Sequence, residues 1–321
     1  MSTSLNEIPP VLSKPNRGQR FRQMLKEIRN NKFLYLFVLP GIVYFLVMKY
    51  LPVYFVQVAF KHYRLGSTVQ SAEWAGLFYF AQVFNSSDFL LALRNTVIIN
   101  LYRLIIGFPA PIILALLLNE VKHKAFKRGI QTLVYLPHFV SWVVIGGIIK
   151  NLLSVQGGLI NELLGMLGSE PIRFLIDPRY FRGILVVSGI WKEVGWGTII
   201  YLATISSIDP QLYESAIIDG ANRFQQAIYI TIPSILYVIV VLLIINMGNI
   251  LNMGLAQIMS LYHDGLRETG LVLQYFVYTR GLVYYRYSFA AAAGLFRSVI
   301  ALIMVISADR LAKGVGQRGI F

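Results

Sequence analysis

The sequence predicts an all-α integral membrane protein with six transmembrane helices. Of the 321 residues, 56% are hydrophobic and only 14% are charged, whereas soluble domains carry about 25% charged residues. A soluble chain of this size could not bury so much apolar surface, so part of its solvent must be lipid. The hydrophobic residues also gather in long spans, which is the pattern of helices that cross a bilayer.

Each of the six apolar spans exceeds the roughly 20 residues that a helix needs to cross the hydrocarbon core. They are residues 33–60, 92–118, 130–153, 181–206, 234–258 and 285–308. In the first span, Pro40, Lys49 and Pro52 predict a kink or an early exit from the membrane. The spans together define a membrane domain, 33–308, between a basic arm, 1–32, and a short tail, 309–321.

The loop charges predict the orientation of these spans. The arm, the 119–129 and 207–233 loops and the tail hold 15 lysines and arginines, against 6 in the intervening loops. Cytoplasmic loops carry the excess of such residues, so we expect both termini in the cytoplasm. No apolar signal core precedes the arm, so we do not expect a cleaved leader. The net charge of +14 is then explained by membrane orientation, without a nucleic-acid partner.

Several kinds of chemistry are absent from the sequence. It has no cysteine, and its four histidines do not have the spacing of metal ligands, so we expect no metal site. It also lacks the phosphate-loop pattern G-x-x-x-x-G-K-[ST]. We therefore expect no catalysis by this chain, no cofactor on it, and no ATP bound through a phosphate loop.

Charged residues inside the spans are candidates for a solute path, because burial of a charge in hydrocarbon costs about 2.5–3.5 kcal/mol even on the lenient scale. Two of them, Lys192 and Glu193, are adjacent in a segment that also contains Trp196 and two glycines. Adjacent helical residues point in different directions, so these two charges do not simply pair. They either face a polar cavity or pair with neighbouring helices. The candidate path residues are Arg103, Lys192, Glu193, Trp196 and Arg297.

Tyrosines and a phenylalanine cluster just outside the sixth span. Such a cluster is typical of the aromatic belt at a membrane interface. Alternatively, Tyr284 and Tyr287 could stack on sugar rings at the outer mouth of a path.

The 207–233 loop contains a segment built like a docking helix. Asp209 is a good N-cap and Pro210 suits the first helical position. Tyr213 and Ala216 follow at helical spacing, and Gly220 can end or bend the helix. The loop is poor in lysine and arginine for the cytoplasmic side, so its partner is something other than lipid phosphate.

This loop resembles the EAA motif of the permease subunits of bacterial ABC importers, E-[AS]-A-x-x-D-G-A followed by I-x-x-P. Residues 214–221 read E-S-A-I-I-D-G-A and residues 230–233 read I-T-I-P. The similarity extends to other segments, among them 94–96, 191–197 and 294–298. Within that family the chain is most similar to the lipoprotein/polysaccharide branch, which includes alginate-oligosaccharide importers.

The resemblance implies a type I importer permease in the bacterial cytoplasmic membrane. Its expected partners are a second permease, two ATPases that hold ATP and Mg²⁺, an extracytoplasmic solute-binding protein, and membrane lipid. The expected substrate is an oligosaccharide, and the basic path residues would suit an acidic one. The resemblance assigns contact with the ATPase to the loop residues Glu214, Ser215, Ala216, Asp219, Gly220, Ala221 and Pro233.

Two other functions fit parts of the sequence. A stand-alone secondary transporter would need internal repeats and an isolated acidic ion site, and Glu193 instead lies beside a lysine. A non-transporting scaffold would explain the polar loop but not the charges inside the spans.

Overall fold

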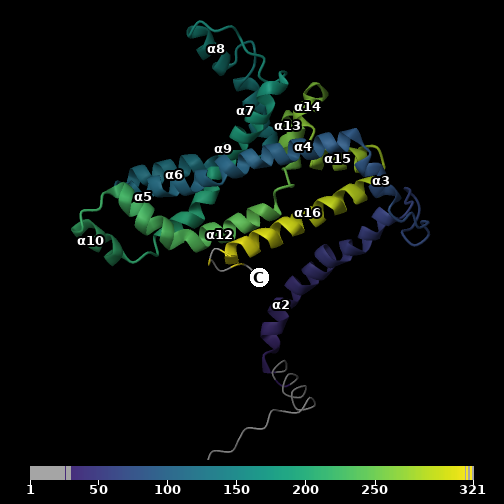
Figure 1. Ribbon diagram of the computed structural model, residues 1–321, viewed down its shortest axis with the longest axis horizontal. Helices are drawn as coiled ribbons and strands as arrows, with labels where there is room; N and C mark the ends of the chain where they lie inside the picture. The colour runs from purple at the N-terminus through teal and green to yellow at the C-terminus, as the bar shows by residue number, and fades with distance from the viewer. Residues whose placement is uncertain (1–25, 27–29, 315, 317–318, 320–321) are drawn as a thin grey trace, which may run out of the picture. The chain divides into compact units, whose positions relative to one another are not determined.

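The computed structural model describes residues 26, 30–314, 316 and 319 (Figure 1). Helices dominate these residues, and the described part of the chain has no strand beyond one isolated bridge between Lys61 and Trp74. The chain divides into two compact units, Met1–Gln57 and Val58–Phe321. The predicted basic arm, 1–32, lies almost entirely outside the described residues.

The first unit is built on α2, Lys32–Phe45, which contains Pro40. The helix continues as a π-helical turn, Leu46–Tyr50, and then as a 3₁₀ segment, Leu51–Phe60, that reaches the second unit. The hydrogen-bond pattern changes next to Pro52, which has no N–H to donate. The first predicted span is thus helical throughout but not a uniform α-helix.

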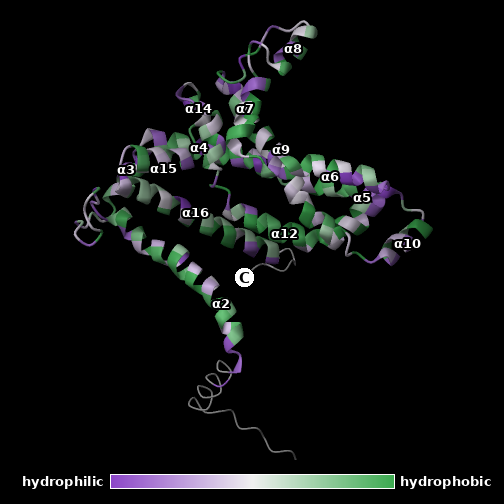
Figure 2. Ribbon diagram, turned by 180° about the vertical axis from the view of Figure 1, so that it is seen from behind, coloured by the Kyte–Doolittle hydropathy of each residue, from purple (hydrophilic) through white to green (hydrophobic). Residues whose placement is uncertain are grey.

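Four further helical stretches, all in the second unit, are long and apolar enough to cross a membrane. They are Ser87–Glu120 (α4, Ser87–Tyr102; η3, Arg103–Gly107; α5, Pro109–Glu120), Pro178–Ile205 (α9), Arg223–Gly248 (α11, Arg223–Gln226; η4, Ala227–Thr231; α12, Ile232–Gly248) and Tyr287–Gly314 (α16). Figure 2 shows hydrophobic residues along most of α5 and α12.

The third predicted span, 130–153, is not one helix. It consists of α6, Lys124–Phe139, and α7, Trp142–Leu152, which meet at an angle of 106°. Pro137 lies near the end of α6, and the Ser141 hydroxyl accepts a hydrogen bond from the Val144 N–H, so a new helix begins there. The described residues therefore contain five spanning helices, or six if this bent pair crosses as one.

The fifth predicted span, 234–258, was too long at its C-terminal end. The helix α12 ends at Gly248, and a separate helix, α13, Leu255–Leu261, follows. Hydropathy extended the prediction across the break because the residues on both sides are apolar. In contrast, α16 continues six residues beyond the predicted end at 308, to Gly314.

Short elements complete the second unit. They are α3 (Phe78–Phe84), α8 (Leu159–Met166), α10 (Pro210–Ile218), η5 (Asp264–Leu266), α14 (Arg267–Gly270), α15 (Leu273–Tyr278) and η6 (Thr279–Val283).

The helix α9 lies at the centre of the second unit, in contact with α4, α5, α6, α12 and α14. Asp177 caps its N-terminus by accepting a hydrogen bond from the Arg179 N–H at 2.9 Å, and Pro178 occupies the first turn. Hydrogen bonds from the Arg179 side chain also hold the pKa of the Asp177 carboxyl below its usual value.

Three apolar clusters make up the core. One joins α9 to α7 and α13 around Phe181 and Ile145. A second joins α4, α15 and α16 around Phe89 and Phe276, and a third joins α5, α9 and α12 around Tyr201. Two of the three clusters contain residues of α9.

Glycine allows α9 to approach α6 closely. A Cβ atom at Gly195 would lie 2.0 Å from the Val134 carbonyl oxygen of α6. Backbone cannot yield as a flexible side chain can, so this position requires glycine.

We predict that Gly195→Ala separates α9 from α6 and destabilises the fold. Overpacking of a well-packed contact costs about 1–3 kcal/mol, so the purified variant should melt at a lower temperature in detergent than the wild type. Gly183→Ala is the matched control, because Gly183 lies on the same helix and no atom comes within 4 Å of its added Cβ. Equal melting temperatures for the two variants would contradict the prediction.

Candidate functional site

The loop helix α10 lies beyond the ends of α5 and α12 (Figure 1). The Asp209 carboxylate accepts a hydrogen bond from the Gln211 N–H at 2.9 Å, and Pro210 begins the helix. At the other end, the Ala221 N–H donates to the Ala216 carbonyl at 2.8 Å and the Gly220 N–H donates to the Ile217 carbonyl at 3.1 Å. This is a Schellman cap, and it needs the positive φ of 80° that Gly220 adopts.

One side of α10 is tied back to the membrane helices. The Tyr213 hydroxyl is 2.9 Å from the Thr231 hydroxyl, just before α12. The following turn is also fixed, since Asn222 and Gln225 form a capping box. Arg223 forms an ion pair with Glu120 at the end of α5, at 3.3 Å. Pro233 lies in the first turn of α12.

The other side of α10 is open. Glu214, Ser215 and Asp219 are exposed, and so is Ile218, with 86% of its surface accessible. Phe224, in the next turn, is also 74% exposed. Exposed apolar residues of this size beside carboxylates are typical of a surface that a partner covers.

A cavity of about 400 Å³ lies beside α9, among η3, α5 and α12. Arg103, Glu193 and Trp196 line it, so the structure brings together three of the five predicted path residues. Gln257 and Asn246 add neutral amides to the lining, and Tyr201 adds an aromatic ring. Aromatic surface with a few convergent polar groups is the usual lining of a small-molecule site.

Arg103 is held at the cavity wall by two hydrogen bonds. Its guanidinium donates to the Gln257 side-chain oxygen and, at 3.2 Å, to the Leu185 carbonyl. The Gln257 amide in turn donates to Ser188 at 2.9 Å. A Cβ at Gly189 would lie 2.9 Å from the guanidinium, so the glycine makes room for Arg103 to cross α9. The Arg103 Nε atom is buried and has no hydrogen-bond partner among the described residues.

Lys192 does not line this cavity; it is buried, and its ammonium group contacts the break between α6 and α7. It donates to three backbone carbonyls, those of Pro137 at 3.1 Å, His138 at 2.6 Å and Val140 at 2.7 Å. Carbonyls at the end of a helix lack helical partners and carry partial negative charge. Of the two roles that the sequence left open for Lys192, this geometry favours pairing with a neighbouring helix.

Glu193 and Trp196 meet the same histidine on α6. The Glu193 carboxylate is 2.9 Å from the His138 Nδ1 atom, and the Trp196 ring stacks on the His138 ring with 4.5 Å between centroids. The Glu193 side chain remains 52% exposed, so it can still meet a solute in the cavity. Nothing in the sequence spacing of His138 distinguishes it from the other three histidines.

The other sequence candidates lie elsewhere. Arg297 donates to the Gln274 side-chain oxygen at 3.1 Å, away from the residues that line this cavity. Tyr284 is 61% exposed beneath the Arg280 guanidinium, and Tyr287 packs edge-on against Tyr63. Gln257 and Asn246 were not predicted, because a neutral amide inside an apolar span carries no distinctive signal.

A family model described as the binding-protein-dependent transport system inner membrane component matches residues 107–318. This range includes α9 and the complete α10 loop. The chain belongs to this family. It is therefore a membrane transport component and not an enzyme.

Three relatives match most or all of the chain. The polygalacturonan/rhamnogalacturonan transport system permease protein YteP of Bacillus subtilis (strain 168) is 42% identical over 321 residues, which is 100% of both chains. Protein LplB of the same organism is 42% identical over 92% of both chains. The arabinooligosaccharides transport system permease protein AraP, also from Bacillus subtilis (strain 168), is 27% identical over 88% of this chain and 90% of its own.

A solved structure confirms the type I importer permease fold. A chain in the crystal structure of a bacterial alginate ABC transporter, in complex with an alginate pentasaccharide-bound periplasmic protein, superposes with a TM-score of 0.85. It is 40% identical, and the match covers 92% of this chain and 99% of that chain.

We predict that Lys192→Met destabilises the permease, because it removes the donor to the His138 and Val140 carbonyls at the α6–α7 break, whereas the Pro137 carbonyl keeps the Val140 N–H at 3.2 Å. Each buried acceptor that loses its partner costs about 1–3 kcal/mol, so the loss should be about 2 kcal/mol or more. The measurement is resistance to thermal unfolding in detergent. Arg297→Met is the control, because it also removes a membrane cation but breaks a single hydrogen bond to a side chain. A Lys192→Met protein as stable as this control would show that these carbonyls do not depend on Lys192.

Proposed function

We propose that this chain is the transmembrane subunit of an ATP-driven importer of acidic oligosaccharides. It lies in the bacterial cytoplasmic membrane with both termini and α10 in the cytoplasm. The observation that carries the proposal is the combination of an exposed, rigidly capped loop helix, which follows α9 in the chain, with a membrane cavity beside α9 that Arg103 and Glu193 line.

The proposed assembly contains a second permease, two ATPases and an extracytoplasmic solute-binding protein. The family description names a binding protein, and the alginate transporter was solved with its periplasmic protein. The sequence of this chain has no phosphate loop, so ATP and Mg²⁺ belong to the ATPase subunits. Each ATP-driven closure would pull α10 and switch the cavity between the two sides of the membrane.

The docking surface for the ATPase is the open side of α10. Glu214 offers a carboxylate to a cationic group of the partner, and Ile218 offers apolar area. Ser215, Ala216 and Ala221 are small, which permits close approach. Asp219 lies directly before the cap at Gly220, which sets the direction in which the chain leaves the docked helix.

The translocation path runs past the cavity beside α9. Trp196 and Tyr201 provide ring surfaces for sugars, and Glu193 accepts hydrogen bonds from hydroxyl groups. Arg103 provides a cation for the carboxylate of an acidic sugar. One relative is named for polygalacturonan and rhamnogalacturonan transport. A second solved structure, 40% identical to this chain, is described as a transporter that imports the acidic polysaccharide alginate.

We predict that Gly220→Trp leaves the chain in the membrane but uncouples it from ATP hydrolysis. The positive φ at this position strains any side chain with a Cβ, and a bulky ring would obstruct docking of α10. In proteoliposomes containing all subunits, ATPase stimulation by loaded binding protein should be lost. Gly220→Asn is the control, because asparagine tolerates this conformation and is smaller. If loaded binding protein stimulated ATPase activity of the Gly220→Trp complex as strongly as that of the wild type, α10 would not couple transport to ATP hydrolysis.

We expect the wild-type complex to respond to acidic oligosaccharides. ATPase stimulation should be several-fold with binding protein that carries oligogalacturonate or oligoalginate, and weaker with neutral arabino-oligosaccharide. The assay compares the same reconstituted complex across this panel. Uptake by the chain alone would favour a stand-alone transporter, and the absence of transport with every subunit present would favour a scaffold.

A further inference from the structure

A second pocket, of about 430 Å³, lies away from the α9 cavity. It is formed by α3 and the segment after it, together with the η6–α16 turn. Its charged lining residues among the described part of the chain are two arginines, Arg280 and Arg286. The amide residues Gln82 and Asn85 and the rings of Phe78 and Phe289 also face it. In the proposed orientation this pocket lies on the extracytoplasmic side, near the turn for which the sequence suggested sugar stacking by Tyr284 and Tyr287.

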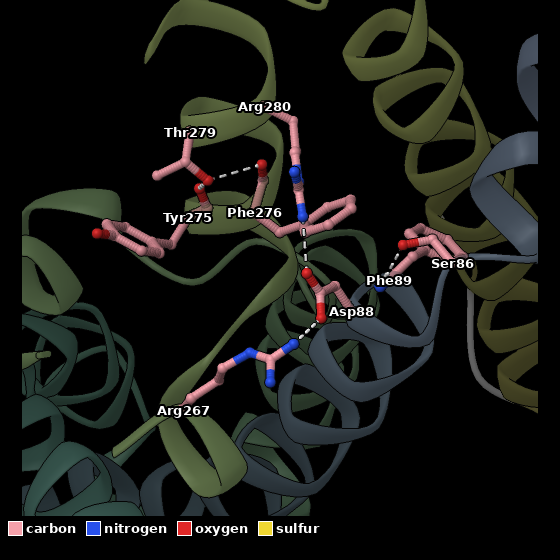
Figure 3. Close-up of polar contacts among 8 residues, drawn as sticks. All are labelled: Ser86, Asp88, Phe89, Arg267, Tyr275, Phe276, Thr279 and Arg280. Atoms are coloured by element: carbon pink, nitrogen blue, oxygen red, sulfur yellow. Dashed lines mark hydrogen bonds and ion pairs between the residues drawn. The ribbon is translucent and has the colours of Figure 1, made fainter. Parts of the chain in front are cut away.

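Arg280 is held in place from several sides (Figure 3). Asp88, near the start of α4, lies between two arginines and accepts hydrogen bonds from Arg267 with one oxygen and from Arg280 with the other, the latter at 2.7 Å. The Arg280 guanidinium also lies 5.7 Å from the centroid of Phe276 and 5.6 Å from that of Tyr284. One Arg280 nitrogen is thereby engaged, while a guanidinium has five N–H donors in total. The remaining donors are oriented before any ligand arrives.

Arg286 is placed by an unusual turn. Tyr285 has a φ of 55°, the one positive φ among the described residues other than glycine. The Arg286 N–H donates to the Arg280 carbonyl at 2.9 Å, so the turn brings the two arginines together. A non-glycine residue in this conformation costs roughly 1–3 kcal/mol, and such strain gathers at binding sites. The Arg286 guanidinium donates to the neutral Gln82 amide oxygen at 3.1 Å and lies over Phe289 at 4.5 Å.

The lining matches the chemistry of an acidic sugar. Guanidinium groups recognise carboxylates through paired, charge-assisted hydrogen bonds. Amides can bond to ring hydroxyls, and the Phe78 ring, half exposed, offers an apolar face. The volume lies within the range of about 300–1,000 Å³ for small-molecule sites. A concave pocket of this size suits a sugar residue better than a carboxylate from the surface of a docked protein.

We propose that this pocket binds a uronate carboxylate of the oligosaccharide before it enters the membrane path. The inference rests on the proposed import function and adds a receiving site to it. Arg280 and Arg286 hold the carboxylate, Asn85 bonds to a hydroxyl group, and Asp88 is a positioning residue that acts through Arg280.

The test uses the complete transporter complex in nanodiscs, without its binding protein, titrated with trigalacturonate and with the fully methyl-esterified trisaccharide at low salt. The ester keeps the sugar rings and removes the charges. We expect the wild type to bind the acid more tightly, Arg286→Gln to weaken acid binding about 10-fold without changing ester binding, and Arg286→Lys to recover part of the loss. Asn85→Ala should weaken both ligands. Arg64→Gln, a matched change of an exposed arginine that does not line the pocket, should have no effect.

The proposal fails if the wild type does not prefer the acid, if Arg286→Gln leaves acid binding unchanged, or if it weakens acid and ester equally. A separate titration of loaded binding protein onto the same complexes tests for a protein-docking surface: the proposal also fails if Arg286→Gln weakens that binding and leaves sugar binding unchanged. Failure of the import function is distinguishable, since the wild-type complex would then show no ATPase stimulation with any loaded binding protein.

Discussion

The ammonium group of Lys192 fixes the bend on which the rest of the membrane domain depends. A lone lysine inside a membrane is costly, and so are helix-end carbonyls without donors. In this fold the two costs offset each other, because the Lys192 ammonium group donates hydrogen bonds to three carbonyls at the α6–α7 break. The break turns α7 by 106° and lets it pack against α13, where Gly146 closely approaches Ser260. One cation on α9 therefore binds the point at which α6 ends and α7 begins, alongside the local effects of Pro137 and the Ser141 cap.

Through the segment 191–197, α9 contacts both α6 and α5, so a movement of α9 would be transmitted to these two helices. Glu193 and Trp196 contact His138 of α6, Gly195 touches the α6 backbone, and Gly197 lies against Pro111 of α5. The helix ends at Ile205, and α10 begins five residues later. In the proposed coupling, a pull on α10 would thus be applied almost directly to the wall of the cavity. The ion pair between Arg223 and Glu120 would carry the same pull to α5.

The sequence predicted features that depend on local chemistry and missed those that depend on distant contacts. The spans followed from hydropathy, and the helix start at Asp209 and its end near Gly220 followed from capping. The break at Val140 was missed because the hydropathy of 130–153 is continuous, although Pro137 and the Ser141 cap are local signals for it. Its contact with Lys192, some 50 residues away, could not be predicted. The sequence also did not predict that Arg103, Glu193 and Trp196 line one cavity. Nor did it predict the contact between His138 and Glu193. Their roles in transport remain predictions.

The two proposed sites, the α9 cavity with Arg103 and the second pocket with Arg280 and Arg286, fit the demands that transport makes on binding. A carrier must bind its cargo well enough to admit it and weakly enough to release it, and several moderate sites achieve this better than one tight site. Arg103 is already engaged by Gln257 and the Leu185 carbonyl, and Arg280 is already engaged by Asp88. Each arginine therefore retains only part of its hydrogen-bonding capacity for a ligand. Under the proposed function, the two sites would attract an acidic oligosaccharide in succession without trapping it at either one.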